Sequence, residues 1–164
     1  MSGIDGYVLR SLSNDDRKYF LDCMKETVLD SVTVDEKEMS DLWIDLIGET
    51  ISSNLDGKMK TEAFILKTDS GKNAGILWMG ESRDQYTCDT TGYVLGVFVE
   101  EELRGKGLGR FLMAEAEDWC RQKGLLSITL NVSPHNRSAR GLYDNMGFFE
   151  RSTVMRKDIP RKQD

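Results

Sequence analysis

The sequence has 164 residues, of which 39% are hydrophobic, and a formal net charge of −6. This length is enough to bury a sizeable core without disulfides or metals, and we expect a single domain over residues 1–160 with a disordered tail over residues 161–164. The acidic balance disfavours a nucleic-acid partner, because binding to a phosphate backbone depends on many Lys and Arg contacts.

The first part of the chain predicts one strand followed by two helices. The run Tyr7–Leu12 is typical of a strand, and Ser13 after it is typical of a helix N-cap. Apolar residues then recur every three or four positions, which indicates two amphipathic helices, the second ending near a turn at residues 54–57. The two apolar stripes are Phe20, Cys23, Met24 and Val28, and Met39, Leu42, Trp43, Leu46, Ile47 and Ile51.

Three strands are predicted next. Residues 61–68 and 74–81 are strand-like, and the residues between them, 69–73, tolerate turn conformations. We therefore expect an antiparallel hairpin. The run 93–99 adds a further strand and completes a meander.

The second half of the chain predicts an alternation of helix and strand. A helix begins near Leu108, a strand covers 127–132, a short helix covers 137–146 and a last strand covers 148–157. The sequence therefore predicts a mixed α/β (α+β) fold.

A glycine-rich loop, Arg104–Arg110 (R-G-K-G-L-G-R), lies between the strand 93–99 and the helix that follows it. Glycines let the main chain approach a ligand closely, and the unpaired N–H groups of a helix's first turn carry a partial positive charge. A phosphate or pyrophosphate is the ligand that such a site prefers. A Rossmann fingerprint would need a glycine where Arg110 stands, and no G-x-x-x-x-G-K-[ST] string occurs, so neither nucleotide motif fits.

A second motif, N-x-x-A-x-x-L-Y-x-x-x-G-F, covers residues 136–148. Together with the R-x-x-G-x-G pattern of the loop, it resembles the motifs of the GNAT superfamily of acetyl-CoA-dependent N-acetyltransferases. The segment from Val94 to Phe148 is similar to the ribosomal-protein alanine N-acetyltransferases of that superfamily. The resemblance implies a GNAT fold, in which a mixed, mostly antiparallel twisted sheet of six to seven strands is flanked by about four helices.

The resemblance also implies a role for each motif residue. The main chain of the strand 97–99 would bind the pantetheine arm of acetyl-CoA, the loop would wrap its pyrophosphate, and Asn136 would hold the arm from the other side. Tyr143 would protonate or steady the departing thiolate. Each residue also has a structural interpretation, as strand core, helix N-cap or helix core. The cofactor-binding residues so implied are Val97, Phe98, Val99, Arg104, Gly105, Lys106, Gly107, Leu108, Gly109, Arg110 and Asn136.

Acetyl transfer to an amine requires an uncharged nitrogen. A lysine-like amine with a pKa of about 10.4 is neutral in only about one molecule in a few thousand at pH 7, so a base or a water chain is expected. The ribosomal-protein branch has a glutamate where this chain has Asn131. Glu81 is then the first candidate for a base that acts through water, and a solvated strand-end charge is the alternative. Tyr93 and Asp89 rank behind Glu81, and His135 is expected on a surface loop.

The resemblance implies a metal-free enzyme that moves an acetyl group directly from acetyl-CoA to a primary amine of a small cationic molecule or of a protein. A catalytically idle acyl-CoA-binding module is the alternative. Dimers are frequent in this superfamily, so a homodimer is among the partners that the resemblance allows. The identity of the acceptor, the general base and the use of acyl groups other than acetyl stay open in the sequence.

Three cysteines without a C-x-x-C pair predict neither a disulfide framework nor a zinc site. The N-terminus lacks the basic patch and apolar run of a signal peptide, and no later apolar run approaches the length of a membrane span. We therefore expect a cytoplasmic protein with no membrane partner.

Overall fold

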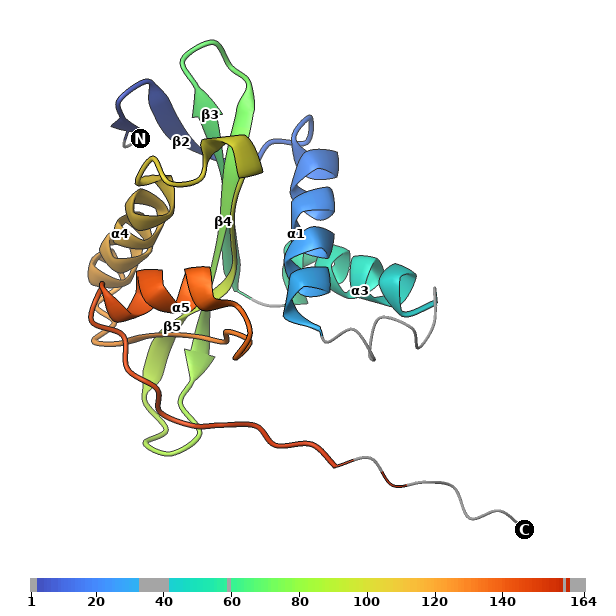
Figure 1. Ribbon diagram of the computed structural model, residues 1–164, viewed down its shortest axis with the longest axis vertical. Helices are drawn as coiled ribbons and strands as arrows, with labels where there is room; N and C mark the ends of the chain where they lie inside the picture. The colour runs from blue at the N-terminus through green and yellow to red at the C-terminus, as the bar shows by residue number, and fades with distance from the viewer. Residues whose placement is uncertain (1–2, 33–41, 59, 158, 160–164) are drawn as a thin grey trace.

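The computed structural model describes residues 3–32, 42–58, 60–157 and 159. A six-stranded sheet lies at its centre, with helices on both faces (Figure 1). The strands are β1 (Gly3–Ile4), β2 (Tyr7–Ser11), β3 (Thr61–Thr68), β4 (Asn73–Arg83), β5 (Thr90–Val99) and β6 (Ile128–Leu130). The helices are α1 (Arg17–Ser31), α3 (Leu42–Ser53), α4 (Leu108–Gln122) and α5 (Arg137–Asp144), with short turns η1 (Asn54–Lys58) and η2 (Glu101–Leu103). None of the described helices is long and apolar enough to span a membrane.

The strands lie in the sheet in the order in which they occur in the chain. Neighbours from β1 to β5 are antiparallel, and β5 and β6 are parallel. The predicted hairpin is confirmed: β3 and β4 pair, and the Thr68 N–H donates to the Lys72 carbonyl across the turn at 2.8 Å. The predicted meander and the mixed α/β class are therefore confirmed, with six strands.

Apolar side chains fill both faces of the sheet, because successive strand residues point to opposite sides. On β4, Leu77 and Met79 belong to a cluster with residues of α4 and α5, whereas Ile76 and Trp78 belong to a cluster with residues of α1 and α3. Figure 1 shows the same division, with α4 and α5 on one side of the sheet and α1 and α3 on the other.

The predicted cap of the first helix is wrong. Asp16, not Ser13, is the N-cap of α1, and it forms no side-chain capping bond. Instead, its carboxylate accepts hydrogen bonds from Ser13 Oγ and Lys67 Nζ, both at 2.7 Å. Lys67 is 51 residues away on β3, so a long-range ion pair fixes the start of α1. Local capping rules do not reveal such a partner.

The predicted last strand over residues 148–157 is also wrong, because residues 149–157 form no strand. Val154 and Met155 are 97% and 91% exposed, so these two apolar side chains pack against no described core residue. A strand is stable only against a partner, and no described strand pairs with this segment. The predicted tail over 161–164 and Met39 of the second helix lie outside the described residues.

Candidate functional site

Strands β5 and β6 run side by side only at the start of β5. Residues 92–94 pair with residues 128–130, and β5 then continues to Val99 without a partner on that edge among the described strands. The parting coincides with a bulge: Trp78 of β4 pairs with Gly96, but Met79 pairs with Val94, which leaves Leu95 between them. A bulge bends its strand, so the end of β5 presents peptide groups that an extended ligand can bind.

The glycine loop follows directly at the end of β5. Gly105 and Gly107 have φ angles of +78° and +82°, a left-handed conformation that other residues rarely adopt. A Cβ at either position would meet nothing within 4 Å, so the space beside the loop is free for a ligand. Helix α4 begins at Leu108 with Gly107 as an N-cap that has no side-chain bond. The N–H groups of its first turn therefore stay available, and the site fits a diphosphate.

The basic side chains of the loop are exposed, and one of them already has a main-chain partner. Arg104 Nε donates to the Val99 carbonyl at 3.1 Å, and its guanidinium lies 5.6 Å from the centre of the Phe98 ring. The carbonyl of Val99 is one of the groups predicted to bind pantetheine. The Val99 carbonyl therefore already accepts one hydrogen bond, and its second lone pair can still accept another.

Helix α5 brings the second motif next to the glycine loop. A Cβ on Gly109, in the first turn of α4, would lie 3.2 Å from Leu142 Cδ2, so the two helices are in close contact there. Tyr143, the next residue, is 8% exposed, and its ring lies 5.6 Å from that of Phe148. Burial raises the pKa of Tyr143, so its hydroxyl keeps a proton at neutral pH.

Asn136 is the N-cap of α5. Its Oδ1 accepts a hydrogen bond from the Ala139 N–H at 3.0 Å. This is the helix N-cap role that the sequence offered as the structural interpretation of Asn136. Its amide nitrogen can still donate to a ligand.

Glu81 lies elsewhere on the sheet, at the C-terminal end of α4. Its carboxylate is 3.8 Å from Lys123 Nζ, which also forms an ion pair with Glu62 at 2.8 Å. Helix α4 has 15 residues and begins at the glycine loop, so this cluster is about 20 Å from the loop. The structure brings Glu81 together with Lys123 and shows no contact between Glu81 and Tyr143 among the described residues.

Tyr93, Asp89 and His135 lie in three different segments: β5, the β4–β5 turn and the loop before α5. Asn131 Nδ2 donates to the Tyr93 hydroxyl at 2.8 Å beside the parting of the strands, and burial raises the pKa of Tyr93. The exposed His135 ring Nε2 lies 2.7 Å from the Asp30 carbonyl at the end of α1. Asp89 is exposed in the β4–β5 turn.

Sequence analysis missed one anchor of the loop. Tyr19 of α1 donates from its hydroxyl to Glu100 Oε1 at 2.7 Å, between the end of β5 and the turn η2 that precedes the glycine loop. Burial is the main cause that raises the pKa of Tyr19, and burial also raises the pKa of the neighbouring Cys23 thiol to about 11. The two partners are 81 residues apart, and no motif signals the pairing.

The parted strands, the glycine loop and the two helices beside it define the fold of the GNAT acetyltransferases. A comparison with family models agrees: the Acetyltransferase (GNAT) family model matches residues 19–148, and the chain belongs to this family.

Individual relatives share about a fifth to a third of their residues with this chain over the aligned regions. The uncharacterized N-acetyltransferase YycN of Bacillus subtilis is 31% identical over 94 residues, which are 57% of this chain and 59% of YycN. The [ribosomal protein bS18]-alanine N-acetyltransferase of Salmonella typhimurium is 30% identical over 70 residues, 43% of this chain and 47% of that enzyme. Among solved structures, AAC(6')-Iy in complex with the bisubstrate analog CoA-S-monomethyl-acetylneamine has a TM-score of 0.67 at 21% identity, over 94% of this chain and 100% of that one.

The matches span only 40 to 59% of the length of three Bacillus subtilis relatives, YycN, YhfO and YdgE. The family and the fold are therefore shared, whereas the donor, the acceptor and the catalytic residues of this chain are matters for proposal.

Proposed function

We propose that this chain transfers an acetyl group from acetyl-CoA to a primary amine. One observation carries the proposal: the open edge of β5 leads toward the glycine loop, and the helix that bears Tyr143 contacts the first turn of α4 that follows this loop. The structure of AAC(6')-Iy, which shares the fold, holds a CoA-based bisubstrate analog.

Acetyl-CoA, when bound, supplies an acetyl group activated as a thioester. The first-turn N–H groups of α4, with Lys106 and Arg110 beside them, would hold its diphosphate. The peptide groups of residues 97–99 would align its pantetheine arm as an added strand. Arg104 would move from the Val99 carbonyl toward the diphosphate, so the free protein and the complex would differ at this side chain.

Tyr143 would act on the leaving group. Its hydroxyl retains a proton at neutral pH because burial raises its pKa, and it can donate that proton to a departing thiolate. Its ring is fixed by Phe148 and by the core of α4 and α5, which limits the positions that the hydroxyl can take.

For the acceptor, we propose an amine of low basicity, such as a protein or peptide α-amine. An α-amine with a pKa of about 7.7–8.0 is neutral in about one molecule in ten at pH 7. It therefore depends much less on a catalytic base for deprotonation than a lysine amine does. Asn131, next to Tyr93, is uncharged, which suits such an amine. Glu81, acting through water, stays the proposed base. The three free cysteines support a reducing compartment such as the cytoplasm.

The test is release of coenzyme A thiol from acetyl-CoA, measured with a panel of α-amines, lysine-like amines and aminoglycosides, alongside calorimetric binding of coenzyme A. The proposal predicts binding together with thiol release that depends on one class of amine. Binding without release for any amine would support an idle acyl-CoA-binding module, and absence of binding would overturn both functions.

A further inference from the structure

The last turn of α1 meets the loop that leads from β6 to α5. Ser133 Oγ donates to the Ser31 carbonyl at 2.6 Å, and His135 Nε2 lies 2.7 Å from the Asp30 carbonyl. Because a carbonyl oxygen only accepts, Nε2 carries the proton in this contact. Asp30 and Ser31 are the last two residues of α1, so their carbonyls have no partner within the helix. The contact thus joins the end of α1 to a loop 102 to 105 residues later in the chain.

Helix α1 is a fixed reference for this contact. Its start is bonded to Lys67 of β3 through Asp16, and its middle packs on Gly96 of β5 through the buried Met24. The position of its last carbonyls is therefore set relative to the central strands. Helices α1 and α5 lie on opposite sides of the sheet (Figure 1), so the contact links the two faces.

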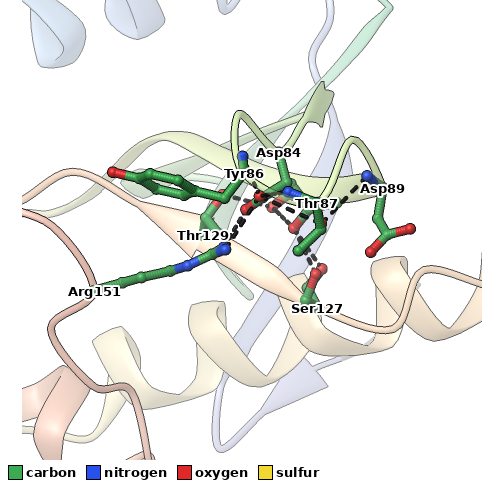
Figure 2. Close-up of polar contacts among 9 residues, drawn as sticks. Asp84, Tyr86, Thr87, Asp89, Ser127, Thr129 and Arg151 are labelled. Atoms are coloured by element: carbon green, nitrogen blue, oxygen red, sulfur yellow. Dashed lines mark hydrogen bonds and ion pairs between the residues drawn. The ribbon is translucent and has the colours of Figure 1, made fainter.

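The pairing of β6 with β5 fixes only the other end of this segment. Side-chain hydroxyls reinforce the short pairing (Figure 2): Ser127 Oγ donates to Thr91 Oγ1 at 2.9 Å, and Thr129 Oγ1 donates to the Gly92 carbonyl at 3.3 Å. The pairing ends with β6, and the contact with α1 then holds the part of the loop next to Asn136.

Main-chain bonds carry the position of this loop into α5. The Asn136 N–H donates to the Ser133 carbonyl at 3.0 Å. The Arg137 N–H donates to the His135 carbonyl at 2.9 Å. Asn136 is also the N-cap of α5, and Tyr143 lies less than two turns further along the same helix. A shift of Ser133 or His135 therefore moves the start of α5 and, with it, Tyr143.

We propose that Ser133 and His135 are positioning residues for the transfer reaction: by bonding the last two carbonyls of α1, they set the place of Asn136 beside the pantetheine arm and of Tyr143 beside the sulfur. The inference rests on the proposed function of this site. It adds a link from α1, on one face of the sheet, to the proton donor on the other face. In this role neither side chain needs to touch a substrate, because both act through Asn136 and α5.

The kinetic test compares the double variant Ser133→Ala, His135→Ala with the wild type. At saturating acetyl-CoA, kcat should fall about tenfold and the KM for the amine should be unchanged, because a displaced Tyr143 hydroxyl weakens only the chemical step. The conservative variants Ser133→Thr and His135→Gln keep a donor for each carbonyl and should retain kcat. A double variant that loses thermal stability but keeps the wild-type kcat would overturn the proposal.

The matched control is Thr27→Val. Thr27 Oγ1 donates to the Cys23 carbonyl at 2.9 Å, so this variant also removes a hydroxyl that bonds a carbonyl of α1. It leaves the contact with the β6–α5 loop in place and keeps the branched shape of the side chain. Its kcat should therefore equal that of the wild type, and a loss as large as that of the double variant would overturn the proposal.

A binding test separates the pantetheine arm from the diphosphate. In calorimetry, the affinity of the double variant for coenzyme A should fall about 2- to 10-fold, which corresponds to one hydrogen bond from Asn136. The affinity for ADP, which has a diphosphate but no pantetheine arm, should stay that of the wild type. An equal loss for both ligands would place the defect at the glycine loop and overturn the proposal.

Hydrogen exchange of main-chain amides tests the positioning of α5 without any ligand. Exchange over residues 137–144 should be faster in the double variant than in the wild type, exchange of α4 should be unchanged, and the conservative variants should match the wild type. Unchanged exchange in α5 would overturn the proposal. If exchange in α5 changes but the wild type binds no coenzyme A, the proposed function fails and the positioning of α5 by α1 stands.

Discussion

Met24 of α1 lies directly against Gly96 of β5: a Cβ built on Gly96 would sit 2.3 Å from Met24 Sδ. Gly96 follows the bulge at Leu95, where β5 turns away from β6, and Met24 is 3% exposed. Helix α1 therefore supports the bent part of the strand through space that only a glycine leaves free.

Gly96→Ala should destabilise the fold by about 1–3 kcal/mol, because the new methyl group overpacks this contact. Met24→Ala alone removes buried side-chain volume and should cost about 2–5 kcal/mol. In the double variant the new methyl group enters the space that Met24 leaves. The loss of stability in the double variant should therefore be smaller than the sum of the losses in the two single variants. Urea unfolding of the four proteins gives the coupling energy, with Gly141→Ala, which has no close neighbour, as control. Strictly additive losses of stability would show that no steric contact couples residues 24 and 96.

Tyr143→Phe should lower kcat by about 10² or more and change KM little, because the variant keeps the ring packing but loses the proton donor. Calorimetric binding of coenzyme A should be unchanged. Tyr7→Phe on β2, where the tyrosine is half-buried, is the control and should have wild-type kinetics. Unchanged kcat in Tyr143→Phe, with chemistry shown to limit the rate, would remove Tyr143 from the mechanism.

The variant Glu81→Gln tests whether Glu81 acts as a catalytic base or only forms an ion pair with Lys123. A base would lose about 10² in kcat/KM, with the loss largest for strongly basic amines. Lys123→Met removes the partner of the ion pair and leaves the Glu81 carboxylate in place, so it should retain activity. If both variants lose the same small amount of thermal stability and retain activity, Glu81 serves only in the ion cluster with Lys123.

Asp16→Asn should destabilise the fold by about 1.5–3 kcal/mol at pH 7, because it leaves Lys67 without its ionic partner. The hydrogen bond from Lys67 is the main cause that lowers the pKa of Asp16 in the folded state. The contribution of Asp16 is therefore fully present above the pKa of the unfolded chain, about 3.9, and is lost as the pH falls through the lower pKa of the folded state. Wild type and variant should converge in stability once the pH lies below the folded-state pKa of Asp16. A stability difference that stays constant throughout the acid titration would contradict this account.

Sequence patterns predicted the features that local interactions determine, such as hairpins and helix starts. The hairpin of β3 and β4, the meander and the start of α4 at Leu108 follow from alternation, turn residues and glycines, and the structure confirms them. The two motifs also pointed to neighbouring parts of the fold, since Gly109 and Leu142 are in contact.

Features that depend on distant partners could not be predicted. Three such features are the ion pair of Asp16 with Lys67 at the start of α1, the hydrogen bond of Tyr19 to Glu100 after β5, and the packing of Met24 on Gly96. Residues 148–157 have the composition of a strand, but composition does not say whether a partner is within reach.

The central claim is that the glycine loop binds the diphosphate of acetyl-CoA. The direct measurement is calorimetric titration of coenzyme A into the wild type, Gly107→Val and Gly71→Val. Gly71 has a φ of +86° and no neighbour within 4 Å, as Gly107 has, but it lies in the β3–β4 turn, so both variants carry the same backbone strain. We predict that the wild type and Gly71→Val bind coenzyme A and that Gly107→Val, although folded, does not. Equal binding by all three proteins, or none by the wild type, would contradict the claim.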